Sequence, residues 1–363
     1  MWGMIELLVD SEEFKKALEQ DIQRAQTRIY IQTLSLEADY AGYFLRDLLF
    51  SSQVRDKRIL VDNYTKIIIN DTHLIFPYNL WNNKLVKEAI GTYKLIKELK
   101  RNGIEIKFSA PLGFVFKNIA ARNHKKIIII DDDISYIGGI NFSEHNFKWH
   151  DIMIRFDSKE ITEFLKNDFL LSWNNKRAIS FKKFKNITFY SLDGYNNRKI
   201  FSLIIKKLET VKKRITIFSP YITFPFLDIL KKLADNGIDV IIISPDKNNK
   251  FFMKKYLLNE IIGTKIKLHL YKKGMSHLKA ILIDDDKVLV GSSNYDYLGY
   301  NIHPEILALI EDKDFIKDFK DRVLNSDLEE SVLFTGGKER AKYNYWKYFL
   351  KFIEKAIVYL KFH

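Results

Sequence analysis

Two stretches of the chain, HKKIIIID (residues 124–131) and HLKAILID (residues 277–284), follow one pattern. In each, counting from the histidine, a lysine stands at +2, an aspartate at +7, a glycine at +14 and an asparagine at +17. The matched positions are His124, Lys126, Asp131, Gly138 and Asn141 in the first stretch, and His277, Lys279, Asp284, Gly291 and Asn294 in the second. An acid follows both, Asp151 at +27 and Glu305 at +28. This recurrence predicts an internal duplication.

The spacing has a physical meaning. Residues i and i+2 of a strand project from one face, so the histidine and lysine of each motif share a surface. The apolar run that follows predicts a buried strand, and the pairs Gly138-Gly139 and Gly291-Ser292 allow a tight turn that returns the asparagine to the same end of the sheet. Two such units related by a pseudo-twofold axis would bring two His, two Lys and two Asn together. That set suits a phosphodiester: one imidazole attacks phosphorus, the other protonates the leaving alkoxide, and the Lys and Asn donors stabilise the equatorial oxygens.

The rest of the sequence alternates helical and strand patterns in the same order in both halves. Helices are predicted over 11–26 (with Ser11 as N-cap), 84–103 and 226–237, and strands over 28–34, 104–108 and 238–243, while 201–222 reads as a helix that leads into a strand. This alternation favours an α/β sandwich over separate α and β domains.

Composition limits the function classes. The chain has 363 residues, 59 Lys+Arg against 46 Asp+Glu, and a net charge of +13, which favours anionic partners: nucleic acid, acidic lipid headgroups or phosphorylated substrates. It has no cysteine, which excludes disulfides, a thiolate nucleophile and cysteine-ligated metal. We expect no membrane span and no secretory signal, so that any membrane contact is peripheral.

The doubled pattern HxKx4Dx6G[GS]xN resembles the phospholipase D superfamily. The resemblance implies two tandem pseudo-symmetric α/β/α lobes with one active site at their interface, complete in a monomer, a covalent phosphohistidine and no metal or other cofactor. We expect a first lobe over 1–185, a second over 186–335 and a C-terminal amphipathic helix over 336–363.

The resemblance also assigns roles. His124 and His277 would be the nucleophile and the general acid/base, with the nucleophile expected to be His124. Lys126, Lys279, Asn141 and Asn294 would bind phosphoryl oxygens. Asp151 and Glu305 would accept the Nδ1–H of His124 and His277 and so fix the imidazole tautomer. Asp131 and Asp284 are expected to be structural partners rather than proton carriers.

Flanking segments are similar to bacterial cardiolipin synthases, namely 5–18, 28–49, 122–144, 149–156 and 291–310. This resemblance implies a short form without membrane helices that transfers a phosphatidyl group from one phosphatidylglycerol to another and releases glycerol, on the cytoplasmic face of the cell membrane. The order Asn301-Ile302-His303-Pro304-Glu305 departs from the family pattern. His303 would be an additional proton carrier or an exposed loop histidine.

Other functions remain open at this stage. Hydrolysis of phospholipid would use the same residues with water as acceptor. A nuclease is permitted by the charge, but superfamily nucleases often have half this length and one motif, so the tandem chain disfavours nucleic acid as the substrate. A non-catalytic binding module would not need every catalytic residue type in both motifs.

Residues 341–363 predict a helix with a lysine stripe beside an aromatic face. Such a helix suits the surface of an anionic membrane, or it packs on the lobe with its lysines in water. The candidates for membrane contact are Trp346, Lys347, Phe349, Lys351, Phe352 and Lys355.

Overall fold

The computed structural model describes residues 4–74, 76–113, 118–177, 179–336 and 345–362. The chain divides into two compact units, Met1–Ala178 and Ile179–His363. The division falls before the hairpin of β10 (Ser180–Phe184) and β11 (Ile187–Asp193), so β10 lies in the second unit, whereas the sequence-based boundary places it in the first.

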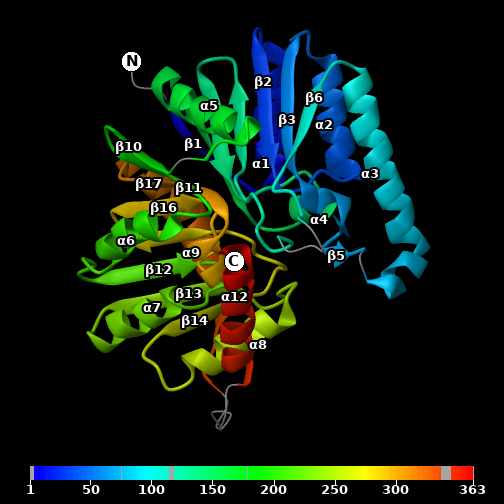
Figure 1. Cartoon of the computed structure of the whole chain (residues 1–363). Coiled ribbons are helices and arrows are strands. Elements are labelled where there is room, and N and C mark those ends of the chain that lie inside the picture. Colours follow the sequence, from blue (N-terminus) through cyan, green and yellow to red (C-terminus); the bar gives the residue numbers. More distant parts are fainter. Residues whose placement is uncertain (1–3, 75, 114–117, 178, 337–344, 363) are drawn as a thin grey trace. The chain divides into compact units, whose positions relative to one another are not determined.

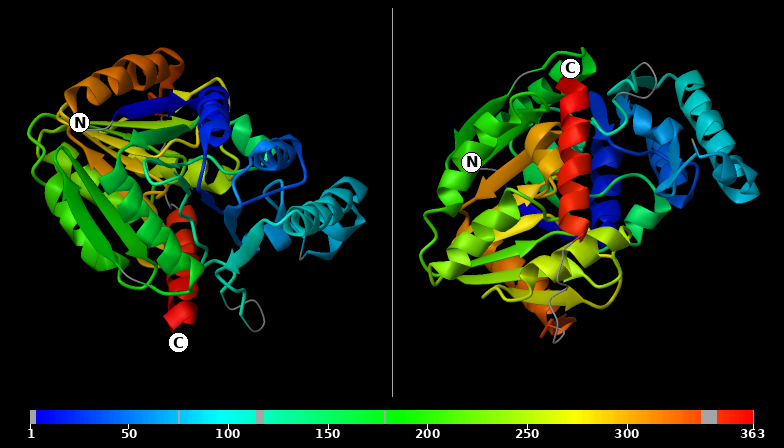
Figure 2. Two further views of the ribbon diagram at one scale, coloured as in Figure 1. Left: turned by 90° about the horizontal axis from the view of Figure 1, so that it is seen from above. Right: turned by 60° about the horizontal axis from the view of Figure 1, so that its bottom comes forward.

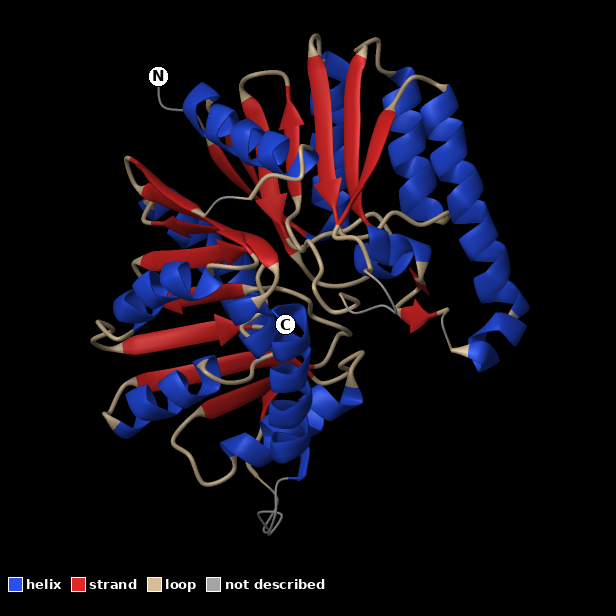
Figure 3. Ribbon diagram, viewed as in Figure 1, coloured by secondary structure: helices blue, strands red, loops and turns tan. Residues whose placement is uncertain are grey.

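Unit 1 is a seven-stranded sheet with helices packed against it (Figures 1 and 3). The sheet order is β1-β9-β8-β7-β2-β3-β6. Its strands are β1 (Ile5–Val9), β2 (Arg28–Thr33), β3 (Asp56–Asp62), β6 (Glu105–Ser109), β7 (Ile127–Ile130), β8 (Ile134–Gly138) and β9 (Ile152–Asp157). Its helices are α1 (Asp10–Arg24), α2 (Tyr40–Ser51), α3 (Asn83–Arg101), α4 (Glu144–Phe147) and α5 (Lys159–Trp173), with short elements η1 (Asn63–Lys66), β4 (Ile68–Ile69), β5 (Thr72–His73) and η2 (Pro77–Trp81).

Unit 2 repeats this plan with one strand added at each edge. Its sheet order is β10-β11-β17-β16-β15-β12-β13-β14-β18. The further strands are β12 (Arg214–Phe218), β13 (Asp239–Pro245), β14 (Lys267–Tyr271), β15 (Ala280–Ile283), β16 (Lys287–Gly291), β17 (Pro304–Ile310) and β18 (Ser331–Leu333). The helical elements are α6 (Asn197–Leu208), α7 (Phe226–Asp235), α8 (Phe251–Ile261), α9 (Tyr297–Asn301), α10 (Lys313–Phe319), η4 (Lys320–Leu324), α11 (Asn325–Glu329) and α12 (Tyr345–Phe362).

The duplication is visible in the strand register. Ile31 of β2 lies opposite Ile128 of β7, four residues after His124, and Ile217 of β12 lies opposite Ile281 of β15, four residues after His277. In both sheets the first strand of each pair also runs parallel to the next two, β3 and β6 or β13 and β14. The predicted α/β class with tandem, related lobes is therefore confirmed.

The core of each unit follows from its apolar strands. All four residues of β7 and all four of β15 are buried, because helices pack on the sheet; in unit 1, α5 packs on β7 and β8 while α1 packs on β1 and β9. The end of each sheet that carries the motif histidine is thereby held on a rigid base.

One local prediction is wrong. Helix α1 begins at Asp10, and its N-cap residue Val9 makes no side-chain cap. Ser11 lies inside the helix, where its buried hydroxyl donates to the Phe147 carbonyl oxygen at 2.6 Å. A tertiary hydrogen bond thus takes the place of the expected local one.

Candidate active site

The first motif lies at the start of β7. His124 and Lys126 precede the strand rather than forming part of it, and their exposed fractions are 7% and 2%. The Lys126 Nζ donates to the His124 carbonyl oxygen at 2.8 Å. The lysine therefore folds back on the backbone of His124, in a segment that lies before the strand in which the shared face was predicted.

Asn141 and Asp151 lie at the same end of the sheet. The Asn141 Oδ1 accepts from the Leu34 N–H at 3.2 Å, at the carboxyl end of β2, and its amide is buried. The Asp151 carboxyl packs on Gly139 so closely that a Cβ there would lie 2.2 Å from both carboxyl oxygens. Likewise, a Cβ on Gly138 would lie 2.3 Å from the Ile152 carbonyl oxygen. Both glycines are needed for these close approaches.

The second motif repeats the arrangement in unit 2. His277 and Lys279 precede β15 and are 6% and 0% exposed. The Lys279 Nζ donates to the His277 carbonyl oxygen and lies 2.7 Å from the His277 Nδ1. The predicted acceptance of the Nδ1–H by Glu305 stays a prediction, as does the same role of Asp151 at His124.

Ser292 replaces the second glycine and changes how the acid is held. The Ser292 hydroxyl donates to the Glu305 carboxylate, which is fully buried. The Ser292 N–H donates to the Ile306 carbonyl oxygen at 3.0 Å, as the Gly139 N–H does to Ile152 at 3.0 Å. Asn294, equivalent to Asn141, is 5% exposed. Each unit thus holds its own His, Lys, Asn and acid on equivalent backbone.

Within the described ranges, the motif aspartates accept hydrogen bonds from backbone N–H groups and from none of the other motif side chains. The Asp131 carboxylate accepts from the N–H groups of residues 26–28 at 2.7–3.1 Å, and Asp284 accepts from those of residues 212–214 at 2.8–3.2 Å. Burial alone would raise the pKa of each carboxyl, but the N–H donors outweigh it and lower the pKa. Each aspartate fixes the loop that leads into the strand beside its motif.

Two buried ion pairs near the first motif were not foreseen. The Arg122 guanidinium lies 2.8 Å from Asp62, whose other oxygen accepts from the Asn123 N–H at 2.6 Å. The Lys125 ammonium lies 2.8 Å from Asp168. Burial raises the pKa of Asp62 to about 6, although Arg122 opposes it. These pairs anchor the residues on both sides of His124, and nothing in the sequence links partners so far apart.

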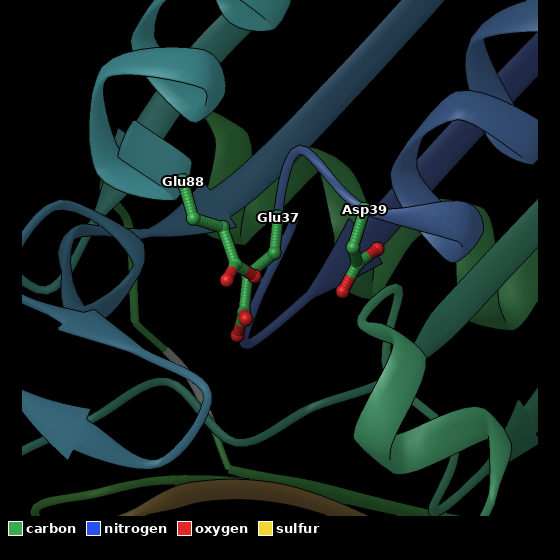
Figure 4. Close-up of side chains that lie close together, drawn as sticks. All are labelled: Glu37, Asp39 and Glu88. Atoms are coloured by element: carbon green, nitrogen blue, oxygen red, sulfur yellow. The ribbon is translucent and has the colours of Figure 1, made fainter. Parts of the chain in front are cut away.

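A group of acids lies beside the first half-site. Among the described residues, only Glu37, Asp39 and Glu88 form a set of three acids with potential ligand atoms within 4.8 Å of one another (Figure 4). Asp39 caps α2 through the N–H groups of residues 41 and 42, and Glu37 accepts from the Asn70 N–H at 2.9 Å. Burial raises the pKa of Glu37 to about 8. Glu37 and Asp39 thus hold the backbone of their surroundings, while Glu88 lies in α3.

Two expectations from the sequence need revision. His303 is 8% exposed, so it is not an exposed loop histidine; its Nδ1 lies 4.0 Å from the Glu305 carboxyl. In α12, Lys347 pairs with Glu260 at 3.2 Å and the Lys351 ammonium lies 5.2 Å from the ring centroid of Phe224. These two lysines contact other residues of unit 2 instead of forming an outward stripe.

The aromatic residues of α12 fall into two groups, one packed against α8 and one exposed. Trp346 packs against Phe251 and Phe252 of α8, and α12 lies beside α8 (Figure 2). Phe349 and Phe352 are 48% and 73% exposed, and Lys355 is also exposed. The predicted helix also includes residues 341–344 and 363, which lie outside the described part of the chain. None of the helices in the described ranges has the length and apolarity needed to span a membrane.

The fold and the doubled motif define a two-lobed enzyme of the phospholipase D superfamily. The family model "Cardiolipin synthase, PLD-like domain" matches residues 18–173 and 204–326, and the chain belongs to this family. It is therefore a phospholipase D-superfamily enzyme of the phosphatidyltransferase type, as the sequence predicts.

Individual relatives agree with this family. The chain is 25% identical to a cardiolipin synthase of Listeria welshimeri over 358 aligned residues, 91% of this chain and 70% of that one. It is 24% identical to cardiolipin synthase 1 of Staphylococcus epidermidis over 91% of this chain and 69% of that one. Among solved structures, phosphatidylserine synthase of Haemophilus influenzae has a similar fold, with a TM-score of 0.71 at 16% identity over 99% of this chain and 94% of that one.

Proposed function

We propose that this chain makes cardiolipin from two molecules of phosphatidylglycerol through a covalent phosphohistidine. The observation that carries the proposal is the pair of matching half-sites, each with a buried His, Lys, Asn and acid on equivalent positions of related sheets. Family membership supports a phosphatidyl group as the transferred unit. The proposal requires that the two half-sites act together, each supplying one imidazole.

The chemistry balances without a nucleotide or a metal. The His124 Nε2 attacks the phosphorus of the donor lipid, a P–N bond forms, and the P–O bond to glycerol breaks while His277 gives its Nε2 proton to the leaving oxygen. His277 then takes the proton from a hydroxyl of the second phosphatidylglycerol. That oxygen forms the new P–O bond and the P–N bond breaks. Lys126, Lys279, Asn141 and Asn294 stabilise the charge on the phosphoryl oxygens in both steps.

The test is product analysis. The purified chain is incubated with vesicles of glycerol-labelled phosphatidylglycerol and, separately, with plasmid DNA. We expect cardiolipin and free labelled glycerol in equal amounts, and intact plasmid. Phosphatidic acid without cardiolipin would indicate hydrolysis instead. Cleaved plasmid with unchanged lipid would establish the nuclease alternative, which the charge of +13 permits.

The division of labour between the histidines is tested by trapping. In a His277→Ala variant, the intermediate should accumulate on His124, where mass spectrometry of the digested chain would find the added phosphatidyl group. A His269→Gln variant, altered in β14, is the matched control and should turn over without accumulation. The adduct on another residue, or its absence in the presence of glycerol release, would contradict the assignment.

We further propose that the enzyme works as a peripheral protein on the cytoplasmic face of the cell membrane. The exposed aromatic rings of α12 support this, since such rings favour the lipid–water boundary. Phe349→Ala combined with Phe352→Ala should reduce cosedimentation with phosphatidylglycerol vesicles. Phe181→Ala, which removes a 61% exposed ring from β10, is the control. Equal binding by both variants would exclude α12 as the contact.

A further inference from the structure

The ring of Tyr221 lies between His277 and the ammonium group of Lys250. The Tyr221 ring meets the His277 ring edge to face, with centroids 6.4 Å apart and planes at 74°. The Lys250 ammonium lies 4.4 Å from the centroid of the same tyrosine ring. Tyr221 is buried, so it forms a fixed spacer between the imidazole and the positive charge.

The loops that carry this stack are tied to each other. The Tyr221 hydroxyl donates to the Asn249 Oδ1 at 2.5 Å, and the Asn248 Nδ2 donates to the Pro220 carbonyl oxygen at 2.8 Å. The Lys250 N–H donates to the Asn248 Oδ1 at 2.8 Å. The backbone at Lys250 is therefore held by the loop after β12, while its side chain is exposed.

Lys250 differs from its neighbours in its charge environment. Lys254 and Lys272 both pair with Asp246, and Lys347 pairs with Glu260. Within the part of the chain that the structure describes, no carboxylate forms an ion pair with Lys250. Its positive charge is attracted to the buried Asp296 at longer range. An external anion would find here a cation that the protein has not neutralised.

Among the described residues, the first half-site has no such stack. Register places Ser35 at the position of Tyr221, because Leu36 bridges to Phe142 as Ile222 bridges to Tyr295. The Thr33 hydroxyl donates to the Ser35 carbonyl oxygen at 3.1 Å, as the Ser219 hydroxyl donates to that of Tyr221 at 2.9 Å. The backbone is equivalent, but a serine cannot support a cation as the ring does.

An acceptor phosphatidylglycerol carries its own phosphate close to the reacting hydroxyl. Its own phosphate is joined to that hydroxyl through the three carbons of glycerol, so five bonds separate the phosphorus from the hydroxyl oxygen, about 6 Å when extended. When His277 takes the hydroxyl proton, this second phosphate must therefore lie near the imidazole. An ammonium group is a suitable point charge for it.

We propose that Lys250, held on the Tyr221 ring, binds the phosphate of the acceptor lipid and so selects an anionic acceptor over a neutral alcohol. This inference rests on the proposed function, because it assumes that His277 serves the acceptor. It assigns Lys250 to acceptor recognition only, so the formation of the phosphohistidine does not depend on it.

The experiment lets two acceptors compete for one intermediate. Labelled phosphatidylglycerol vesicles are supplied with ethanol, and cardiolipin and phosphatidylethanol are measured together, so that their ratio is independent of the donor step. In Lys250→Gln we expect this ratio to fall about fivefold, as for the loss of one partly screened ion pair, while phosphatidylethanol forms at the rate of the natural chain or faster. Lys250→Arg should keep most of the ratio, and added salt should lower the ratio in the natural chain more than in Lys250→Gln.

The control is Lys255→Gln, which removes an exposed lysine of α8 that lies 5.5 Å from the Phe251 ring centroid. Its product ratio should not change. An unchanged ratio in Lys250→Gln, or an equal loss of both products, would overturn the assignment of Lys250 and leave the proposed function standing. If the natural chain formed neither product, the proposed function would fail, and this inference would fail with it.

Discussion

The two half-sites match in backbone and differ in how each holds its acid. In unit 1 the Asp151 carboxyl fills the space where Gly139 has no side chain. In unit 2 the longer Glu305 meets the hydroxyl of Ser292, which stands at the equivalent position. The short acid therefore packs against a glycine and the long acid bonds to a serine, and in both units the carboxyl lies next to the residue that follows the motif glycine. The difference teaches that equivalent backbone in the two units holds the acid with different pairs of side chains.

A second difference lies in the loops beside the motifs. Glu37 carries a buried carboxyl in unit 1, and Thr223 stands at the equivalent position in unit 2. The Thr223 hydroxyl lies 3.3 Å from the carboxyl of Glu354, which comes from α12. Both units therefore have a buried carboxyl at this loop. In unit 1 it belongs to Glu37 of the loop itself, and in unit 2 it belongs to Glu354 of the C-terminal helix. That helix has no counterpart among the described elements of unit 1.

The largest expected effect tests whether the two half-sites form one functional unit. His124→Ala and His277→Ala should each lower turnover by about 10³-fold or more, and the double variant should lose no more than either single one, because groups that act in one reaction are not additive. Turnover of labelled phosphatidylglycerol measures this. If each single variant kept about half of the turnover, the two half-sites would work as independent sites. His269→Gln should keep full activity.

The second-largest expected effect comes from the residues that hold the two acids, Gly139 for Asp151 and Ser292 for Glu305. A Cβ on Gly139 would lie 2.2 Å from both oxygens of Asp151, so Gly139→Ala must displace that carboxyl. We expect a loss of about 10- to 100-fold in kcat, as for other residues that orient a reacting group. Ser292→Ala removes only one hydrogen bond to Glu305 and should cost less. Kinetics should be measured beside thermal melts of both variants; equal losses in kcat would mean that the two acids are held equivalently.

Much of this comparison could be predicted from the sequence, because the motifs and the helix–strand order are local patterns that recur. The strands β7 and β15 follow from their apolar runs, and the acids follow from their spacing. The stack of Lys250 on Tyr221 could not be predicted, since its partners come from different loops and meet only in the folded sheet. The burial of His303 and the position of Ser11 inside α1 likewise depend on tertiary contacts that outweigh local preference.

A smaller effect concerns the stability of each unit rather than its chemistry. Asp131→Ala and Asp284→Ala each leave backbone N–H groups without their carboxylate acceptor. Because these contacts are exposed and water replaces part of what is lost, each variant should lower the free energy of unfolding by about 0.5–1.5 kcal/mol. Since the folded pKa of both carboxyls is lowered, their contribution is present above the unfolded pKa of about 3.9 and is lost as the pH falls through the folded pKa. Urea unfolding of each variant at neutral and acid pH measures both points.

The control for this pair is Asp286→Ala, which removes a 62% exposed side chain two residues from Asp284. It should change the free energy of unfolding by about 0.5 kcal/mol or less. A loss for Asp286→Ala as large as that for Asp284→Ala would mean that the measured effect comes from general charge balance and not from the backbone contacts.

The smallest effect concerns the carboxyl that α12 supplies. Burial and, to a smaller extent, the nearby Asp296 raise the pKa of Glu354 to about 9, although the hydrogen bond from the Thr223 hydroxyl opposes this rise. The unfolded carboxyl ionises near pH 4.3, so the docked helix binds more protons than the undocked one between these values. Docking must therefore weaken as the pH rises toward 9. Asp296 has a pKa raised by burial to about 6, so measurements above pH 7 isolate Glu354.

Hydrogen exchange along α12 at about pH 7 and about pH 9, corrected for the intrinsic pH dependence, measures this docking. We expect protection of the natural chain to fall several-fold across this range and that of Glu354→Gln to stay nearly constant, because the amide keeps the shape and cannot ionise. Glu329→Gln, which changes an exposed carboxyl in α11, should behave like the natural chain. If Glu354→Gln lost protection as steeply as the natural chain, the carboxyl behind the Thr223 loop would not control the docking of α12, and the analogy with Glu37 would be one of position alone.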